Sequence, residues 1–487
     1  MSATCKNADH VTLTQQYHYY DPVEDSIIVE DKDSFTLIGY GSLLNNSSPG
    51  MKHVDAALFT FQNIKVLTIE GITINGNFKM AKGIQVNDIS NATLRDITIK
   101  NLRNIKPGDN ALGIDIRVIN GSVINGDNIR ISEIDGNHDG NINSGSGGIG
   151  IARALYIKLD YNGTVSTDIA QKNTKITMNN SYFEWVYGDD GDVIDIIDET
   201  FTSHALHRFI FTNCTIRYAT RRLVKGSASG IQYYNCKFDS TTEDDLIAKM
   251  GGGQITFTPS GGVNFRNANP GLHDTFRNMY GKMINCEYRN TGNLLINSGT
   301  TLIGAYTDGL EIRGNRFYNT YVRFQDKVAN AIVDGNSFFN ADIELNVQES
   351  NWEEGRSYLI NNYGHYAPAE SIFPALINST NDIINVTIDN NKVYSYESSG
   401  VNFFGLVRHR SGTKASNVNV SNNEITRVNN PVNRKEYLFS FVNWESSCKV
   451  FNNLINQTGL GVGMVFSGVS FSGATWDNYD GDGVEIT

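Results

Sequence analysis

The densest group of acidic side chains lies between Tyr187 and Glu199, where the chain reads YGDDGDVIDIIDE. Carboxyl groups donate and accept protons, and hydrolysis of a glycosidic bond uses a pair of them. If Ile194 points into a core, alternation along a strand sends Asp195 to the outer face. The two glycines bend the backbone around Asp190 and its neighbour. The segment therefore predicts several carboxylates at one strand edge, although a solvated acidic loop or a calcium-binding turn has the same composition.

The spacing of these acidic residues limits how they can work together. Retaining glycosidases hold their two carboxyl groups about 5–5.5 Å apart, and inverting ones about 6.5–9.5 Å apart. Asp192 and Asp195 are three residues apart, which on a straight strand means about 10 Å and opposite faces. They form a working pair only if the backbone bends between them. Otherwise the partner carboxylate must come from a neighbouring strand.

A cluster of positive charge follows the acidic segment. Arg221, Arg222 and Lys225 lie within five residues, in a chain whose formal net charge is -12. One interpretation is that they form salt bridges to the acidic segment. The other is that they bind a carboxylated sugar, because arginine matches carboxylate geometry with two parallel hydrogen bonds. The same cations would serve a lyase, which needs a base beside a carboxylate and cations to neutralise the developing enolate.

The composition favours a repeated β structure over several globular domains. The 487 residues include 46 glycines and 8 prolines, and 19% are charged, which suits many short strands joined by tight turns. The acidic balance, with a pI near 5.3, argues against nucleic acid as a partner. We find no signal peptide and no apolar run long enough to span a membrane, so we expect no membrane association.

The five cysteines form no zinc-binding pattern, and their number is odd, so we expect a reduced chain synthesised in a cytoplasm and no metal or other cofactor. Cys214, Cys236 and Cys286 each follow an asparagine directly. This shared position predicts a small apolar ladder in a repeated structure, since no histidine or carboxylate shares the position.

One phrase recurs along the chain: an alternating apolar strand, a kink at asparagine, glycine or aspartate, and a second short strand. Examples are FIFTNCTI at 209–216 and VTIDNNKV at 386–393. The kink asparagines are spaced at 22, 50, 30, 21, 26, 29, 32 and 30 residues, and they are Asn213, Asn235, Asn285, Asn315, Asn336, Asn362, Asn391, Asn423 and Asn453. A solenoid with coils of about 20–32 residues fits these intervals, one of which is doubled.

Stacking such units buries a continuous apolar column that one unit cannot bury alone. Asparagine tolerates the left-handed conformation of a sharp corner, and its side chain can bond to the same residue in the next coil. The pattern resembles the right-handed, single-stranded parallel β-helix of pectate lyases, polygalacturonases and phage tailspikes over about Ile27 to Phe471. We therefore predict an all-β fold of this kind.

The opening also resembles tailspikes, since residues 26–42 read SIIVEDKDSFTLIGYGS. The resemblance implies an entry segment at 1–30, a β-helix body at 27–458, and a cap or trimer-locking segment at 459–487. It implies a homotrimer in the virion, which acts outside the host cell after synthesis in the host cytoplasm. A tail or baseplate protein would hold it through an N-terminal adaptor, which is missing from this sequence or very short.

The phrase Gly188-Asp189-Asp190 is similar to the adjacent aspartates of polygalacturonases. No Gly-His-Gly follows it, and Arg221 to Lys225 only loosely matches the Arg-x-Lys element of that family. The resemblance implies acid or base roles for Asp189, Asp190 and the nearby Asp192.

We predict a phage depolymerase that binds and hydrolyses a bacterial capsular or O-antigen polysaccharide. The predicted catalytic residues are Asp192 and Asp195, with Asp189 and Asp190 as rivals. The predicted substrate-binding residues are Arg221, Arg222, Lys225, His207, Tyr187 and Trp185. The alternatives are a lyase that acts by elimination and a non-catalytic protein that grips glycan.

Overall fold

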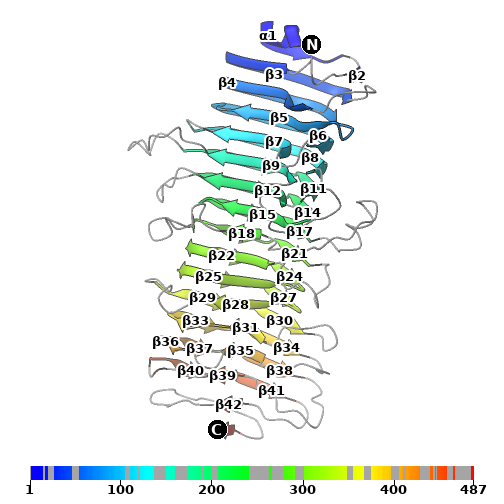
Figure 1. Ribbon diagram of the computed structural model, residues 1–487. Helices are drawn as coiled ribbons and strands as arrows, with labels where there is room; N and C mark the ends of the chain where they lie inside the picture. Colours follow the sequence, from blue (N-terminus) through cyan, green and yellow to red (C-terminus); the bar gives the residue numbers. More distant parts are fainter. Residues whose placement is uncertain are drawn as a thin grey trace. The chain divides into compact units, whose positions relative to one another are not determined.

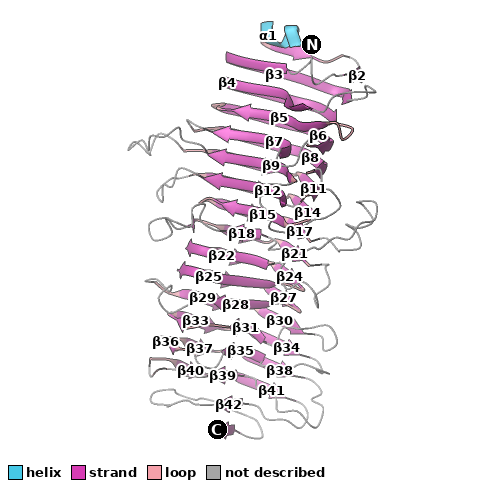
Figure 2. Ribbon diagram, viewed as in Figure 1, coloured by secondary structure: helices cyan, strands magenta, loops and turns pink. Residues whose placement is uncertain are grey.

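The computed structural model consists almost entirely of β-strands (Figures 1 and 2). It describes residues 2–14, 17–19, 27–45, 54–104, 110–118, 121–136, 150–159, 173–188, 190–198, 207–240, 263–265, 278–290, 301–347, 355–366, 375–395, 405–409, 413–427, 439–441, 445, 447–457, 464–466 and 484–486. The chain divides into two compact units, Met1–Phe276 with Thr291–Asn293, and Arg277–Asn290 with Leu294–Thr487.

The first unit begins with the short helix α1 (Ser2–Asn7) and continues in strands. These are β1 (His10–Thr12), β2 (Tyr17–Tyr19), β3 (Ile27–Asn45), β4 (Val54–Asn75), β5 (Met80–Asn87), β6 (Asn91–Arg103), β7 (Asn110–Val118), β8 (Val123–Asp135), β9 (Ile151–Leu159), β10 (Lys175–Asn179), β11 (Tyr182–Tyr187), β12 (Asp190–Asp198), β13 (Arg208–Thr212), β14 (Thr215–Ala219), β15 (Arg222–Ser227), β16 (Ile231–Tyr234), β17 (Lys237–Asp239) and β18 (Val263–Phe265).

The strands of this unit form coils, as Figure 1 shows for β11, β12, β14 and β15. The chain runs through β10, β11 and β12, and then β13, β14 and β15 pair in parallel with those three strands in the same order. A chain that returns in parallel to each strand in turn has completed one coil of a helix. This confirms the predicted fold class, a parallel β-helix. The fully buried Ile194, Ile196, Phe183 and Ile216 are part of the apolar column inside these coils.

A stacked bend runs through the sheet that contains β7, β9, β12 and β15. Strand pairing is in register on both sides of Ala154 and Val193, yet these two residues have no partner of their own. Both are fully buried, as are Leu155 and Ile194, which follow them. Two consecutive inward residues reverse the alternation, so the positions on either side of them face outward.

The second unit repeats the same arrangement. Its strands are β19 (Asn278–Met279), β20 (Lys282–Ile284), β21 (Glu287–Arg289), β22 (Thr301–Asp308), β23 (Glu311–Arg313), β24 (Arg316–Tyr318), β25 (Tyr321–Ala329), β26 (Ile332–Asp334), β27 (Ser337–Phe339), β28 (Asp342–Asn346), β29 (Ser357–Ile360), β30 (Tyr363–Tyr366), β31 (Ala375–Ser379), β32 (Ile383–Ile384), β33 (Val386–Asp389), β34 (Lys392–Ser395), β35 (Gly405–His409), β36 (Ala415–Ser416), β37 (Asn419–Ser421), β38 (Glu424–Arg427), β39 (Phe439–Phe441), β40 (Lys449–Phe451), β41 (Leu454–Gln457), β42 (Met464–Phe466) and β43 (Val484–Ile486).

Asparagine ladders hold the corners of this unit, as the sequence predicts. The amide nitrogens of Asn315, Asn336, Asn362 and Asn391 donate to the side-chain oxygen of the ladder asparagine in the next coil, at 2.9, 3.0, 3.0 and 2.9 Å. The predicted position of the left-handed residue is right for Asn213, Asn235 and Asn285 and wrong by one in the later coils. There the preceding residue has the positive φ: Gly314, Gly335, Asn361, Asn390, Asn422 and Asn452. One residue adopts the left-handed conformation of the turn, and the asparagine that follows it makes the ladder hydrogen bonds.

All five cysteines are free and buried. Cys214 and Cys236 occupy equivalent places, each directly after a left-handed asparagine and before a pair of matched strands, β14 and β17. The backbone N–H of Cys286 donates to the Asn315 side chain, so in the second unit the cysteine position is also the asparagine-ladder position. No helix within the described ranges is long and apolar enough to cross a membrane.

Candidate functional site

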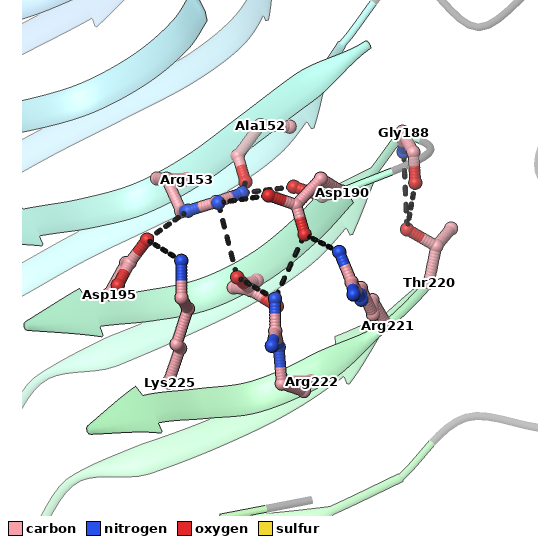
Figure 3. Close-up of polar contacts among 10 residues, drawn as sticks. Ala152, Arg153, Gly188, Asp190, Asp195, Thr220, Arg221, Arg222 and Lys225 are labelled. Carbon is pink, nitrogen blue, oxygen red and sulfur yellow. Dashed lines mark hydrogen bonds and ion pairs between the residues drawn. The ribbon is translucent and has the colours of Figure 1, made fainter. Parts of the chain in front are cut away.

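Three adjacent strands of the first unit bring together most of the residues that the sequence singles out. Strand β12 lies between β9 and β15, and Asp192 stands opposite Arg153 on one side and Arg222 on the other. Asp195 stands opposite Tyr156 and Lys225 in the same two strands. We call Arg153, Asp190, Asp192, Asp195, Arg221, Arg222 and Lys225 the charged network (Figure 3).

The bend at Val193 places Asp192 and Asp195 on the same outer face. Both Val193 and Ile194 point inward and are fully buried, whereas the aspartates that flank them reach the same guanidinium group of Arg153. The sequence predicts a poor pair unless a bend intervenes, and the structure contains that bend. Alternation alone fails here because it assumes a straight strand.

Arg153 is the centre of the charged network. Its Nη2 lies 2.7 Å from Asp190 Oδ2 and 3.2 Å from Asp192 Oδ2, and its Nε lies 2.9 Å from Asp195 Oδ2. Its Nη1 donates to the carbonyl oxygen of Ala152 at 2.8 Å and to that of Asp190. One buried guanidinium therefore fixes the positions of three carboxylates.

The cations of β15 complete the network from the next coil. Arg222 donates from Nε and Nη2 to the two oxygens of Asp192 at 2.7 and 3.0 Å, and from Nη2 to Asp190 Oδ1 at 2.9 Å. Arg221 also pairs with Asp190, and Lys225 Nζ lies 3.4 Å from Asp195 Oδ2. The interpretation of these cations as salt-bridge partners of the acidic segment is confirmed for all three.

Neighbouring charges affect the pKa values of Asp190 and Arg153 more strongly than burial does. Burial alone would raise the pKa of Asp190, but Arg153, Arg222 and Arg221 lower it well below its usual value. Burial would lower the pKa of Arg153, and the three aspartates raise it above its usual value instead. Asp190 and Arg153 are therefore held in their charged forms at neutral pH.

Asp195 differs from the other two aspartates in one respect. The side chain of Asp192 accepts hydrogen bonds on both oxygens, and so does that of Asp190. Asp195 is 1% exposed, accepts on Oδ2 from Arg153 and Lys225, and has no hydrogen-bond partner for Oδ1 within the described residues. A buried carboxylate oxygen without a donor is costly, and such an oxygen is available to accept a proton from a ligand or a water molecule.

Two glycines shape the turn that leads into β12. A side chain at Gly188, where φ is +153°, would have a Cβ 2.0 Å from the carbonyl oxygen of Gly150. A Cβ at Gly191 would lie 2.2 Å from Thr220 Oγ1, and this hydroxyl donates to the Gly188 carbonyl oxygen at 2.6 Å. Close packing against the Gly150 backbone therefore requires Gly188, and close packing against the Thr220 hydroxyl requires Gly191. Asp189, a predicted rival for catalysis, lies outside the described residues.

Three residues, Arg153 within the network and Asp115 and Tyr156 beside it, have no assigned role in our sequence analysis. Arg153 follows a glycine-rich run, and Asp115 and Tyr156 align with Asp195 in successive coils of the same sheet. Burial raises the pKa of Asp115 above its usual value, and Arg117 only partly offsets this. The similar phrases GIDI at 113–116 and VIDI at 193–196 were the available signal.

The outer face of this sheet carries a positive balance on an acidic protein. On β5, β7, β9, β12 and β15, and at Arg221 directly before β15, its described cations are Lys82, Arg117, Arg153, Lys158, Arg221, Arg222 and Lys225, and its described carboxylates are Asp115, Asp190, Asp192 and Asp195. Seven positive groups against four acidic ones leave a local balance of three positive charges, whereas the whole chain has -12. Such a surface attracts an anionic ligand.

The remaining predicted binding residues lie elsewhere. Trp185 is half-buried and contacts Tyr218, with ring centroids 4.4 Å apart. The hydroxyl of Tyr187 donates to the Glu133 carboxylate, and burial together with this bond raises its pKa. His207 is 2% exposed, and its Nδ1 accepts from the Thr174 N–H at 3.1 Å. The described contacts do not bring His207 into the charged network.

Eight chains of solved structures match this chain, and two of them are described below. No family model matches the chain, and no curated protein matches it. Tailspike protein 3 of bacteriophage CBA120 is 9% identical with a TM-score of 0.38, and the match covers 89% of this chain and 59% of that one. PfbA, a surface adhesin of Streptococcus pneumoniae, is 12% identical with a TM-score of 0.32, and the match covers 90% of this chain and 81% of that one. The chain thus spans about three fifths of the tailspike's length.

Proposed function

We propose that this protein is a tailspike-type depolymerase that binds an acidic bacterial surface polysaccharide and hydrolyses its glycosidic bonds at the outer face of β9, β12 and β15. The observation that carries the proposal is the Asp195 carboxylate. It is buried and fixed through one oxygen by two cations, while its other oxygen has no described hydrogen-bond partner. The homotrimer and the place in a virion belong to the same proposal and rest on the resemblance of the opening phrase.

The hydrolytic step needs a base and an acid. Asp195 Oδ1 takes a proton from a water molecule whose oxygen attacks the anomeric carbon. Asp115 lies two coils away, and burial raises its pKa, which favours the protonated form that gives its proton to the leaving glycosidic oxygen. Two coil steps of about 4.8 Å separate the backbones of the two residues by about 9.6 Å, which is close to the inverting range of about 6.5–9.5 Å and far from the retaining distance, so we include inversion at the anomeric carbon.

The remaining members of the network position and bind. Asp190 and Asp192 have arginine partners on both oxygens, so they orient Arg153 and Arg222 and do not exchange protons. Arg221 and Lys225 retain 25% and 19% of their side-chain exposure, and they would bind the carboxylates of the substrate. A uronic or nonulosonic acid suits these groups and the positive balance of the face.

The same positive balance favours a second candidate, a lyase. In that reaction Asp195 would remove the proton next to a sugar carboxylate, and the surrounding cations would neutralise the enolate that forms. The products separate the two reactions, because elimination leaves an unsaturated sugar that absorbs ultraviolet light and hydrolysis does not.

The test uses a panel of purified acidic capsular and O-antigen polysaccharides, with polymer size, reducing ends and ultraviolet absorbance followed together. We expect shorter chains with new reducing ends and no absorbance. Asp195→Asn should lower the rate at least about 100-fold while the polymer still binds. Asp33→Asn is the control, because Asp33 is exposed and pairs only with Lys65 in the described contacts.

Each other outcome overturns a defined part of the proposal. Rising absorbance would replace hydrolysis by elimination. Bound but uncut polymer would leave a receptor-binding protein. Full activity of a correctly folded Asp195→Asn variant would remove the site, and a panel without any binding would remove the function.

A further inference from the structure

Left-handed backbone positions in this protein belong almost entirely to asparagine and aspartate. Of the 25 described non-glycine residues with positive φ, 17 are asparagine and 3 are aspartate. The other five are Phe78, Glu133, Trp185, Tyr218 and Tyr280. Three of these exceptions form one column, because Trp185 lies between Glu133 and Tyr218 in the register of β8, β11 and β14.

The fold does not require aromatic residues in this column. Asn101 has the same position one coil before Glu133, with φ +57°, and it fits there as asparagine does at the other corners. A bulky side chain in the left-handed region costs about 1–2 kcal/mol relative to an ordinary conformation. Two neighbouring aromatic residues that keep this strain indicate a role other than folding.

The rings of Trp185 and Tyr218 are in contact but are not parallel. Their planes meet at 38°, and both residues are half-buried. An aromatic column of the second unit shows the contrast, because the rings of Tyr318 and Phe339 stack at 4.7 Å with only 8° between their planes. Parallel stacked rings cover each other's faces, whereas tilted rings at a corner leave apolar surface for a ligand.

Charged groups border the aromatic pair. The Arg217 guanidinium lies over the Tyr218 ring at 4.8 Å, and its Nε lies 2.5 Å from Glu184 Oε2. Arg217 and Glu184 keep 34% and 23% of their side-chain exposure. Aromatic faces beside a donor and an acceptor are the combination that recognises a sugar ring, with its apolar C–H face and its equatorial hydroxyl groups.

The aromatic corner is next to the charged network along the chain. Trp185 precedes Asp190 by five residues, and Tyr218 precedes Arg221 by three. Asp190 and Arg221 pair directly and are the more exposed aspartate and arginine of the network. The corner therefore lies in the two coils that hold every member of the network except Arg153.

We propose that Trp185 and Tyr218 form a sugar-stacking subsite for the same polysaccharide that the charged network cleaves, with Arg217 binding a hydroxyl or carboxylate group of the stacked sugar. This proposal rests on the proposed function, since it extends the same site by one sugar. We name an acidic polysaccharide as the occupant because Arg217 lies over the Tyr218 ring and Arg221 follows Tyr218 by three residues.

The test is the double variant Trp185→Asn and Tyr218→Asn, assayed on the polysaccharide that the wild-type protein binds in the panel. Asparagine is the residue that this chain uses at such corners, so the thermal midpoint should stay the same or rise. We expect the Kd for that polysaccharide, measured in the Asp195→Asn background, to increase at least about tenfold. The double Phe variant should bind like the wild type, because it keeps the rings.

Tyr280→Asn is the matched control, because Tyr280 is also an exposed aromatic residue with positive φ, at 61°, but belongs to the second unit. It should not change binding. An unchanged Kd in the double Asn variant would overturn the subsite and leave the proposed function intact. A wild-type protein that binds no polysaccharide would overturn both.

Discussion

Asp342 is a buried acid at a position that the fold assigns to apolar side chains. It is 2% exposed and begins β28, one residue before Ile343. Ile343 aligns with Ile377 and Val407 in the next two coils. The counterparts of Asp342 are therefore Leu376 and Leu406, and both are fully buried. The Asp342 Oδ1 has no hydrogen-bond partner within the described residues. We predict that Asp342→Leu stabilises the second unit.

The magnitude follows from burial and the missing hydrogen bond. A buried, unsatisfied polar group costs about 1–3 kcal/mol, and burying a leucine side chain stabilises by roughly 2 kcal/mol. Some overpacking offsets this gain, so we expect a net of about 3 kcal/mol. For a unit of about 200 residues this corresponds to an increase of about 6–12 °C in the thermal midpoint.

The stabilisation depends on pH with a defined sign. Burial, and then the charge of Glu344, raise the folded-state pKa of Asp342 well above its usual value. The folded wild type therefore keeps a proton that the unfolded chain releases, and its stability falls as pH rises from about 4 through the folded pKa. The advantage of Asp342→Leu should be larger at pH 8 than at pH 4.

Thermal unfolding at pH 4, 6 and 8 measures this, with unfolding rates in denaturant as the readout if unfolding is irreversible. Asp342→Asn should remove the pH dependence and recover less stability, because the amide stays buried. Glu344→Gln is the control on the same strand, and it should destabilise slightly because Glu344 pairs with Arg323 at 2.8 Å. A midpoint of Asp342→Leu at or below that of the wild type at pH 8 would refute the reasoning.

Two further predictions concern buried polar groups. Asn362→Ala should lower the free energy of unfolding by about 4 kcal/mol, because the Asn362 side chain makes four hydrogen bonds of about 1 kcal/mol each. The control is Asn361→Gly at the exposed neighbouring position, which keeps the left-handed turn and should cost less than about 1 kcal/mol. Equal unfolding rates of the two variants would contradict the ladder's role. Arg153→Met should cost about 3–5 kcal/mol at pH 7, since three carboxylates lose a partner. Calorimetry at pH 3 should show a smaller deficit, because protonation lowers the repulsion, and a constant deficit would argue against the network.

The fold was predictable because one local rule repeats. Each coil needs an apolar strand, a corner residue that accepts positive φ, and a second strand. This pattern recurs many times in the sequence. The ladder followed from the same rule, since an asparagine at an equivalent position in every coil meets its own copy. The one-residue error at Asn315 and later markers arose because two adjacent positions at the corner both favour asparagine. The residue type alone does not indicate which of the two adopts the positive φ.

The site was only partly predictable. The acidic segment and the Arg221 to Lys225 cluster were recognisable as charge, but the central cation, Arg153, lies about 40 residues before Asp195 and meets it only through stacking. Asp115 and Tyr156 were missed for the same reason, because their relation to Asp195 is one of coil register and not of spacing. The bend at Val193, which puts Asp192 and Asp195 on one face, depends on packing against neighbouring coils.

Several departures from local rules gather in the same coils of the first unit. Strands β9, β12 and β15 bury charges on an outer face, and the corner before β12 and β15 holds strained aromatic residues where asparagine would fit. The second unit resolves its corners with asparagines that satisfy one another. Because sequences violate local preferences mainly where function requires it, these coils are where we place the chemistry. The salt bridges do not argue against that role: Arg153 fixes three carboxylates before any ligand binds, and such preorganisation is how an enzyme avoids rearranging charges during the reaction.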